Sequence, residues 1–182
     1  MKISKSGFTI VELLIVIVVI GILAAITIVA YNGIQQRSKN SARASEVASV
    51  TKLLELYKAS KGDYPGVASV VSSGVDKKFC IGTNFPGNVC DSSSVSSTDT
   101  TFTDKLATLG NVPSSHSRTT NGNAGPVVTV WGGGWGFTLQ MWMQGSQTSD
   151  CPSQIPNLWW DDPNSDALLC GINYNFMTQL GA

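Results

Sequence analysis

A single carboxylate, that of Glu12, stands near the start of an apolar segment that spans residues 8–30. The 18 residues from 13 to 30 carry no charge, and this length suits a helix that crosses a membrane. A carboxylate in such a place is costly to bury unless a cation pairs with it. Lys2 and Lys5 precede the segment, so the short N-terminus is expected to stay in the cytoplasm.

The stretch KSGFTIVELL, residues 5–14, resembles the class III signal peptide of the type IV pilin superfamily. In that superfamily a short basic leader ends in Gly, Phe follows, and Glu stands four residues later at the start of an apolar helix. The resemblance continues through residues 21–26 to Tyr31, whereas the C-terminal part of the chain has no such close match.

The resemblance implies that a membrane-bound prepilin peptidase cuts between Gly7 and Phe8 and that the new amine of Phe8 is methylated. It also implies that, in a filament, this amine pairs with Glu12 of a neighbouring subunit. Phe8 and Glu12 are four residues apart, which is one turn along one face of a helix. A secretory signal peptide is disfavoured by the length of the apolar run, and a plain single-pass anchor leaves Glu12 unexplained.

Four cysteines follow the membrane segment, in a compartment that is expected to be oxidising, and an even count there favours disulfides. Of the three possible pairings we favour Cys80–Cys90 and Cys151–Cys170, because each pair flanks a loop rich in Gly or Pro. A zinc site is disfavoured because the chain has no C-x-x-C motif and one histidine. That histidine, His116, is expected to be an exposed loop residue.

No residue pattern typical of an enzyme is found, since P-loop, G-x-S-x-G and H-E-x-x-H motifs are all missing. We therefore expect a protein that is not an enzyme and needs no cofactor. Asp162, Asn164 and Asp166 alternate oxygen-bearing side chains as calcium loops do, and some pseudopilins of the superfamily bind calcium in this part of the fold. Because Ala167 stands where an EF-hand has Gly, a polar turn is favoured over a calcium site.

A long helix must carry the N-terminal residues. Residues 34–60 contain neither Pro nor Gly, and their apolar side chains recur at steps of three and four. These are Ala44, Val47, Val50, Leu54 and Tyr57. We predict one helix from Phe8 to Ser60, with a weak point at Asn32-Gly33 and a stop at Gly62.

The remaining residues, 62–182, predict a head domain with a small antiparallel sheet. Strands are expected at 127–131, 135–142 and 168–174, with a turn at 132–134, because apolar and polar residues alternate there between Gly clusters. A short helix is expected at 102–110, with Thr103 as a possible cap, and a solvated Ser/Thr/Asp loop at 91–101.

The chain is thus expected to have an α+β fold of the type IV pilin kind. It would consist of a leader (1–7), a membrane and filament-core helix (8–30), an amphipathic continuation (31–61) and the head (62–182).

The five tryptophans at positions 131, 135, 142, 159 and 160 are expected to lie mostly in the core of the head. Trp159 and Trp160 are adjacent, so a regular strand would turn them to opposite faces. One of the two would then be available as an adhesive or subunit contact.

Three functions remain open. A structural subunit of a type IV pilus, serving adhesion, twitching motility or DNA uptake, is favoured because Glu12 is typical of a polymerising subunit in the superfamily. A pseudopilin of a type II secretion or competence system is the alternative. A membrane-tethered binding domain that never polymerises is disfavoured by Glu12 and by the Gly7-Phe8 junction.

The resemblance also implies partners and places. The partners are identical or related subunits, the prepilin peptidase, and an assembly platform with its ATPase. Before assembly the chain would cross the cytoplasmic membrane once, with the head outside, and as a pilin it would then join a surface filament. Loss of Lys2 and Lys5 with the leader leaves ten basic residues against twelve acidic ones, so direct nucleic-acid binding is not expected.

Overall fold

A computed structural model describes most of the chain. The described residues are 7–65, 74–91, 95–96, 100–114, 116, 119, 122–132, 136–145, 150–162, 164 and 166–174. The predicted leader up to residue 6, the turn residues 133 and 134, Trp135, and residues 92–94 and 97–99 of the predicted Ser/Thr/Asp loop lie outside them. The chain divides into two compact units, Met1–Ser38 and Lys39–Ala182.

Helix α1 (Ile10–Lys61) begins in the first unit and ends in the second. It continues without a break through Asn32-Gly33, where the sequence predicts a weak point. The helix ends where Gly62 takes the left-handed conformation, with a φ of 81°, and donates its N–H to the carbonyl of Lys58 at 2.8 Å. The predicted helix from residue 8 to residue 60 is therefore confirmed, with both ends shifted by one or two residues.

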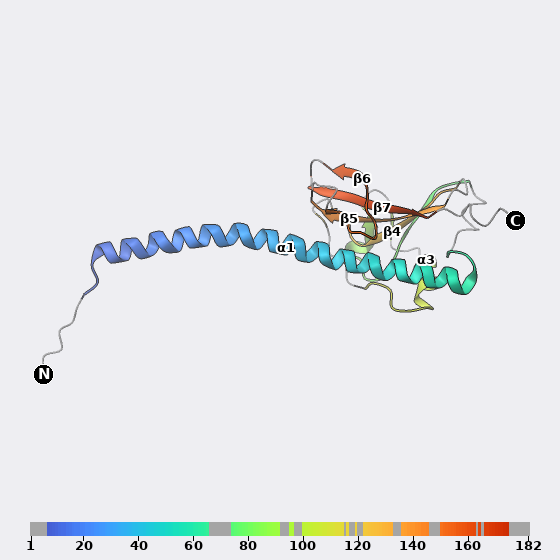
Figure 1. Cartoon of the computed structure of the whole chain (residues 1–182), viewed down its shortest axis with the longest axis horizontal. Helices are drawn as coiled ribbons and strands as arrows, with labels where there is room; N and C mark the ends of the chain where they lie inside the picture. The colour runs from blue at the N-terminus through green and yellow to red at the C-terminus, as the bar shows by residue number, and fades with distance from the viewer. Residues whose placement is uncertain are drawn as a thin grey trace, which may run out of the picture. The chain divides into compact units, whose positions relative to one another are not determined.

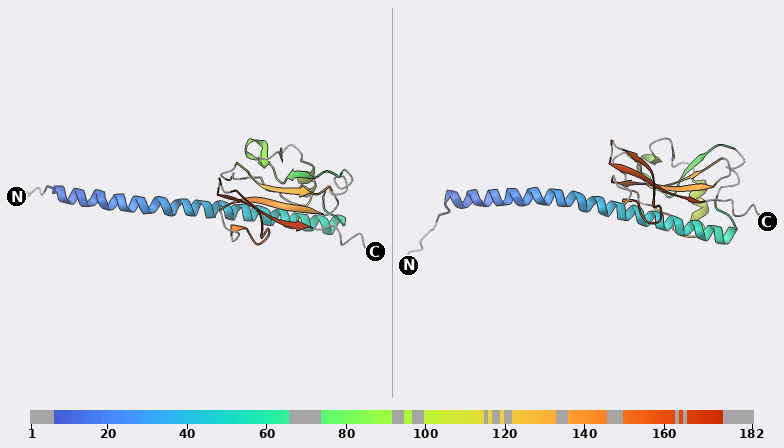
Figure 2. Two further views of the ribbon diagram at one scale, coloured as in Figure 1. Left: turned by 90° about the horizontal axis from the view of Figure 1, so that it is seen from above. Right: turned by 45° about the horizontal axis from the view of Figure 1, so that its top comes forward.

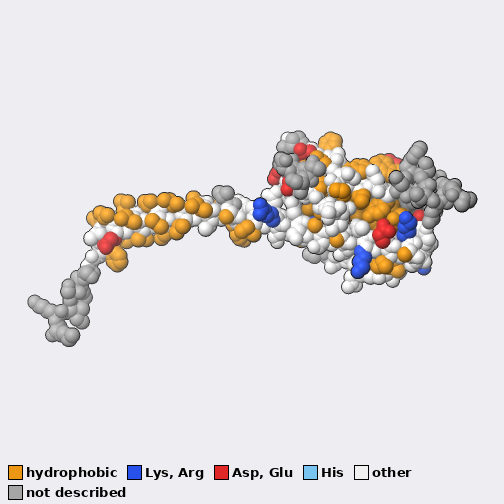
Figure 3. All heavy atoms as spheres, in the orientation of Figure 1, with side chains coloured by type: hydrophobic (Ala, Val, Ile, Leu, Met, Phe, Trp, Pro, Cys, Tyr) orange, Lys and Arg blue, Asp and Glu red, His pale blue; other side chains and the backbone are white. Residues whose placement is uncertain are grey.

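The first unit presents an apolar surface. Its described large hydrophobic side chains between Phe8 and Ile34 are exposed, and hydrophobic side chains line much of this unit in Figure 3. Within the described residues, α1 is the one helix that is long and apolar enough to cross a membrane. Such a surface requires a lipid or protein environment in place of water.

The second unit contains a five-stranded antiparallel sheet in the order β1-β4-β5-β7-β6. The strands are β1 (Lys77–Cys80), β4 (Pro126–Val130), β5 (Phe137–Gln144), β7 (Ala167–Tyr174) and β6 (Asn157–Asp162). The part of α1 that belongs to this unit runs along one face of the sheet (Figures 1 and 2). The predicted α+β fold, a long helix packed on a small antiparallel sheet, is confirmed.

Three of the five strands match the predicted ones, namely β4, β5 and β7. The two edge strands were not predicted from the sequence. β1 has four residues and starts with two lysines, and β6 carries no apolar alternation. Such features are common on edge strands, which bury only part of one face and avoid pairing with other chains.

The core forms where α1 meets the inner face of the sheet, which is the face that α1 covers. Alternate residues of β5 point inward, and they are Phe137, Leu139, Met141 and Met143. They pack against the predicted stripe of α1, of which Val47, Val50 and Leu54 are fully buried. Burial of each such side chain contributes about 1.5–3 kcal/mol, so this layer is the main source of stability.

Polar groups also attach α1 to the sheet. Asn40 forms a two-way amide contact with the end of β5: its Nδ2 donates to the carbonyl of Gln144, and its Oδ1 accepts the Gln144 N–H at 3.0 Å. Arg43, which the sequence places outside the apolar stripe, is 1% exposed and donates to Asn40 Oδ1 at 2.9 Å. Burial lowers the pKa of the Arg43 guanidinium, and the neighbouring charge of Glu46 opposes that change.

The predicted short helix is present, but its predicted cap at Thr103 is wrong. Helix α3 (Thr101–Ala107) is shorter than predicted, and Thr103 lies inside it and not at its cap. The Thr103 hydroxyl is buried, donates to the carbonyl of Cys80 at 3.0 Å and accepts the N–H of Gly82 at 3.1 Å. A threonine that satisfies two backbone groups at the end of β1 cannot also cap its own helix.

The predicted solvated loop at 91–101 also contains regular structure. A 3₁₀ turn, η1 (Pro86–Asn88), leads into a two-stranded antiparallel sheet of β2 (Val89–Asp91) and β3 (Val95–Ser96). Asp91 is buried and accepts a hydrogen bond from Lys78 Nζ at 3.1 Å, which pairs its charge. This ion pair connects the small sheet to β1.

A bulge in β6 changes the predicted orientation of the adjacent tryptophans. Leu158 pairs with Cys170 and Trp160 with Leu169, so Trp159 is the extra residue. The pairing places Trp160, like its partner Leu169, on the outer face of the sheet, which is the face opposite α1. Trp159 packs on Gly171, which also faces outward. The expectation of opposite faces is therefore wrong, because the bulge interrupts the two-residue alternation.

Both disulfides close within the second unit. The structure joins Cys80 to Cys90 and Cys151 to Cys170, the pairs favoured from the sequence. Cys80–Cys90 holds β2 beside the end of β1, and Cys151–Cys170 fastens the segment before β6 to β7.

Replacing Cys151 and Cys170 together by Ser should destabilise the second unit. The bridge spans 19 residues, and loop-closure entropy then predicts a loss of about 3 kcal/mol. Chemical denaturation of the full chain in detergent measures the loss, and peptide mapping without reductant checks both pairs. A crossed pairing, or an unchanged denaturation midpoint, would contradict the prediction.

Candidate functional site

The N-terminus of α1 is capped by its own side chains. Thr9 N–H donates to Glu12 Oε2 at 2.7 Å, the Thr9 hydroxyl donates to the same oxygen at 2.8 Å, and Glu12 N–H donates to Thr9 Oγ1 at 3.2 Å. This reciprocal arrangement is a capping box, which satisfies backbone N–H groups that the first helical turn cannot. Glu12 therefore has neutral local partners in the isolated chain.

Thr9 is a functional residue that the sequence interpretation missed. The signal was available, because Thr-x-x-Glu before an apolar run is the sequence form of a capping box. The presence of the cap explains why α1 begins at Ile10 and not at Phe8. The three hydrogen bonds of the capping box use either Oε2 or the backbone N–H of Glu12. The other carboxylate oxygen, Oε1, can therefore accept a hydrogen bond from a further donor.

The Gly7-Phe8 bond lies before the helix. Residues 7–9 are not helical, and Phe8 is 81% exposed. The bond therefore precedes the first residue of α1, Ile10, and lies outside the helical turn that contains Glu12.

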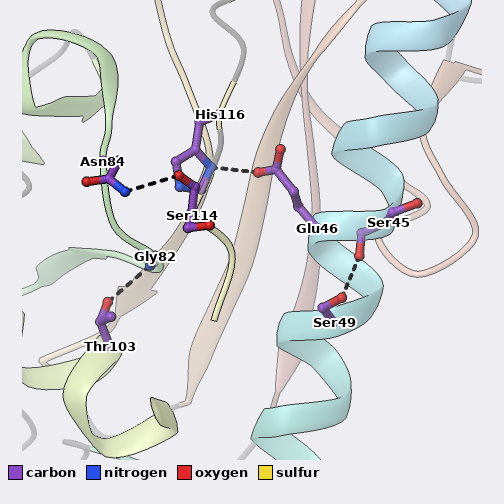
Figure 4. Close-up of polar contacts among 8 residues, drawn as sticks. All are labelled: Ser45, Glu46, Ser49, Gly82, Asn84, Thr103, Ser114 and His116. Atoms are coloured by element: carbon purple, nitrogen blue, oxygen red, sulfur yellow. Dashed lines mark hydrogen bonds and ion pairs between the residues drawn. The ribbon is translucent and has the colours of Figure 1, made fainter. Parts of the chain in front are cut away.

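A second polar cluster lies inside the second unit, around His116 (Figure 4). The His116 side chain is fully buried, its Nδ1 lies 2.7 Å from Glu46 Oε2 on α1, and its ring stacks on Phe85 at 4.1 Å between centroids. The prediction of an exposed loop residue is wrong. Gly82 makes the burial possible, since a Cβ there would lie 2.7 Å from His116 Nε2.

A shallow groove of about 490 Å³ lies beside this cluster. One wall is the face of α1 with Ala42, Ser45, Glu46 and Ser49, and residues 111–114 form the other. The serine hydroxyls donate to carbonyls one turn earlier in α1, at 3.1 Å for Ser45 and 2.9 Å for Ser49. Glu46 is already paired with His116, so the groove contains neither a nucleophile with a base nor a set of metal ligands.

The weak calcium candidate, Asp162 with Asn164 and Asp166, contains an Asx turn. Asp162 Oδ1 accepts the N–H of Asn164 at 3.0 Å, which is an Asx turn, and the carbonyl of Asp166 accepts the N–H of Gly145 at 2.9 Å. Among the described residues, no three His, Cys, Asp or Glu side chains come together as metal ligands would. The turn ends β6 and begins β7.

Comparisons with known proteins agree with the N-terminal geometry. Residues 3–28 match the family model described as the prokaryotic N-terminal methylation motif. Two relatives are "Type II secretion system core protein G" of Aeromonas hydrophila, 29% identical over 76 residues, and the protein of the same name from Pectobacterium carotovorum subsp. carotovorum, 28% identical over 73 residues.

These alignments cover 42% and 40% of the chain and 53% and 47% of the two relatives. The chain thus matches about half the length of the curated relatives. No solved structure gives a significant match.

Residues 3–28 thus carry the N-terminal methylation motif, and the chain is similar to proteins of the pilin and pseudopilin superfamily. The similarity to type II secretion pseudopilins is distant. Proteins of this superfamily are structural and not enzymes, in agreement with the sequence analysis. The class III signal and the apolar helix together indicate a membrane-anchored precursor.

His116 should stabilise the second unit by joining its own loop to α1. Replacement by Ala leaves a cavity beside Phe85 and removes the partner of Glu46, so we expect a loss of about 2–3 kcal/mol in unfolding free energy. Ser45→Ala is the matched control, because Ser45 is exposed on α1 beside the same cluster and its hydroxyl bonds to a carbonyl of its own helix, that of Ser41 at 3.1 Å. Chemical denaturation should separate the two variants, and equal stability would contradict the assigned role.

Proposed function

We propose that the chain is a polymerising subunit of the pseudopilin kind, cleaved by a prepilin peptidase and assembled through the first part of α1. The observation that carries this proposal is the methylation motif over residues 3–28 together with the distant similarity to type II secretion core protein G. An exposed apolar helix with one carboxylate suits a subunit that leaves the membrane for a helical core of like subunits.

Cleavage between Gly7 and Phe8 would place a methylated amine directly before the capping box. Glu12 keeps its Oε2 with Thr9, so Oε1 is free to accept the amine of a neighbouring Phe8. In the apolar core of a filament this pair would neutralise both charges, and loss of either partner would strand the other. Glu12 would thereby set the register between subunits.

The other regions take the roles expected from the sequence. Residues 1–7 form the leader, 8–30 the membrane and filament-core helix, 31–61 its amphipathic continuation, and 62–182 the head. The partners would be copies of this chain or related subunits, the prepilin peptidase, and an assembly platform with its ATPase. The precursor would lie in the cytoplasmic membrane with its head outside.

A type IV pilus subunit is the second candidate. The same motif and the same Glu12 serve both kinds of filament, and the chain matches only about half of the secretion proteins' length. Adhesion, twitching motility or DNA uptake would follow from that function. A membrane-tethered domain that never polymerises would have no use for the Gly7-Phe8 junction, and Glu12 would then serve only to cap the helix.

A deletion strain can distinguish the two filament types. A pseudopilin predicts loss of a set of secreted proteins from the medium, with no change in surface filaments. A pilus subunit predicts that electron microscopy of sheared surface material loses its filaments, and that mass analysis finds this chain in wild-type filaments. If neither secretion nor filaments change, assembly as the function would be rejected.

Processing should yield a mature chain that starts at N-methylated Phe8. Mass analysis of the N-terminal peptide from the membrane fraction tests this. Gly7→Val should leave the leader attached, since the resemblance implies that the peptidase requires a small residue before the bond, whereas Ser6→Ala is the matched control and should be cut normally. A start at Met1 or after Ala25 would contradict the motif assignment.

Glu12→Ala should insert and be cut normally but fail to assemble when it is the sole subunit. Glu12→Gln is the informative variant, because Gln also forms a capping box but cannot neutralise an amine. If the charge acts in assembly, the Gln variant should assemble as poorly as the Ala variant. Filament yield relative to the membrane pool is the measurement, and normal yield from Glu12→Gln would show that capping is the role of Glu12.

A further inference from the structure

The outer face of the sheet gathers four tryptophans. Strand pairing places Trp142, Leu169 and Trp160 in one row across β5, β7 and β6. These residues point away from α1, because their neighbours Met141, Met143, Leu168 and Cys170 belong to the core. Two further rows follow on the same face, Gln140 with Gly171 and Thr138 with Asn173. We call Trp131, Trp142, Trp159 and Trp160 the tryptophan platform.

The platform is held in place by the sheet beneath it. Trp131 Nε1 donates to Thr138 Oγ1 at 2.9 Å, and that hydroxyl donates to Asn173 Oδ1 at 3.3 Å. Trp159 packs on Gly171, where a Cβ would lie 2.8 Å from its Nε1, and its ring stacks with that of Trp131 at 6.5 Å between centroids. The orientations of the Trp131 and Trp159 indoles are therefore set before any ligand arrives, which lowers the entropic cost of binding.

The platform is accessible. Trp160 is 62% exposed, and Trp131, Trp142 and Trp159 are partly exposed. Asn173 is exposed, and its amide Nδ2 can donate to a ligand while Oδ1 accepts from Thr138. Trp142 and Trp160 stand two strands apart, about 9–10 Å at the backbone, which is comparable to a disaccharide unit.

The platform also lacks charge. The residues of β5, β7 and β6 that pair in these three rows are uncharged, and Asp162 lies in the next row with Gln144 and Ala167. The row of Thr138 continues through Thr129 of β4 to Lys78 of β1, whose charge is paired with Asp91 at 3.1 Å. A face whose lysine is already paired with an acid gives little electrostatic attraction to a phosphate backbone. The Thr138 hydroxyl and the Gln140 amide of this face are buried, and Asn173 supplies the exposed amide beside the indoles.

We propose that the tryptophan platform binds an uncharged, pyranose-containing glycan. A pyranose ring presents C–H groups on its faces and hydroxyls around its edge. The C–H faces can lie on the broad indole surfaces, while Asn173 donates to a hydroxyl at the edge. This inference does not depend on how the chain assembles.

Titration of the full-length chain with neutral hexasaccharides tests the proposal. The detergent must have no sugar headgroup. The probes are cellohexaose, chitohexaose and maltohexaose, and their binding is measured by calorimetry and by tryptophan emission. At least one should bind and shift the emission. Trp160→Ala should weaken that binding by roughly tenfold or more, because an exposed indole at the centre of a contact carries much of its free energy.

Leu158→Ala is the matched control, since Leu158 lies on the same strand, is also exposed, and pairs with the inward-facing Cys170. It should bind as the wild type does, and both variants should keep the wild-type melting temperature. The proposal is overturned if no neutral hexasaccharide binds, if only an anionic glycan such as heparin binds, or if Trp160→Ala binds normally. A change in sedimentation alone, without glycan binding, would make the platform a subunit contact and equally overturn it.

Discussion

The packing of α1 on the inner face of the sheet is the interaction on which the second unit depends. Val47, Val50 and Leu54 meet the inward residues of β5, and Asn40 fixes the position of the helix along that strand. Since one face of the sheet is used for the core, the residues that alternate with the core positions must lie on the other. The aromatic and amide groups of the outer face follow from that division.

The same helix imposes a different constraint in the first unit. Its apolar side chains are exposed there, so this part of the chain requires a membrane or the apolar core of an assembly. Glu12 is the one ionisable group in the apolar segment, and its capping box with Thr9 gives it partners without a cation. A carboxylate satisfied locally can enter the membrane with its helix and still accept an incoming amine.

Contacts distant in sequence decide the roles of several residues in the head. The residues next to His116 in the sequence show no apolar periodicity that would indicate burial, yet Phe85, Gly82 and Glu46 surround its side chain. Thr103 occupies a position that suits a cap, yet it binds the end of β1. His116 and Glu46 are 70 residues apart in the sequence, and Thr103 and Cys80 are 23 residues apart. Local sequence patterns could not reveal partners at such separations.

The sequence alone determined the long helix, the three central strands, the favoured cysteine pairs and the segment that marks the superfamily. These depend on local signals: hydrophobic period, turn residues, and the spacing of Gly7, Phe8 and Glu12. Only the tertiary structure decided the edge strands, the burial of His116 and Arg43, and the common face of Trp159 and Trp160. The physical reason is that a strand's register, and any bulge in it, is set by the partner strand, and the side chains of β6 take their direction from β7.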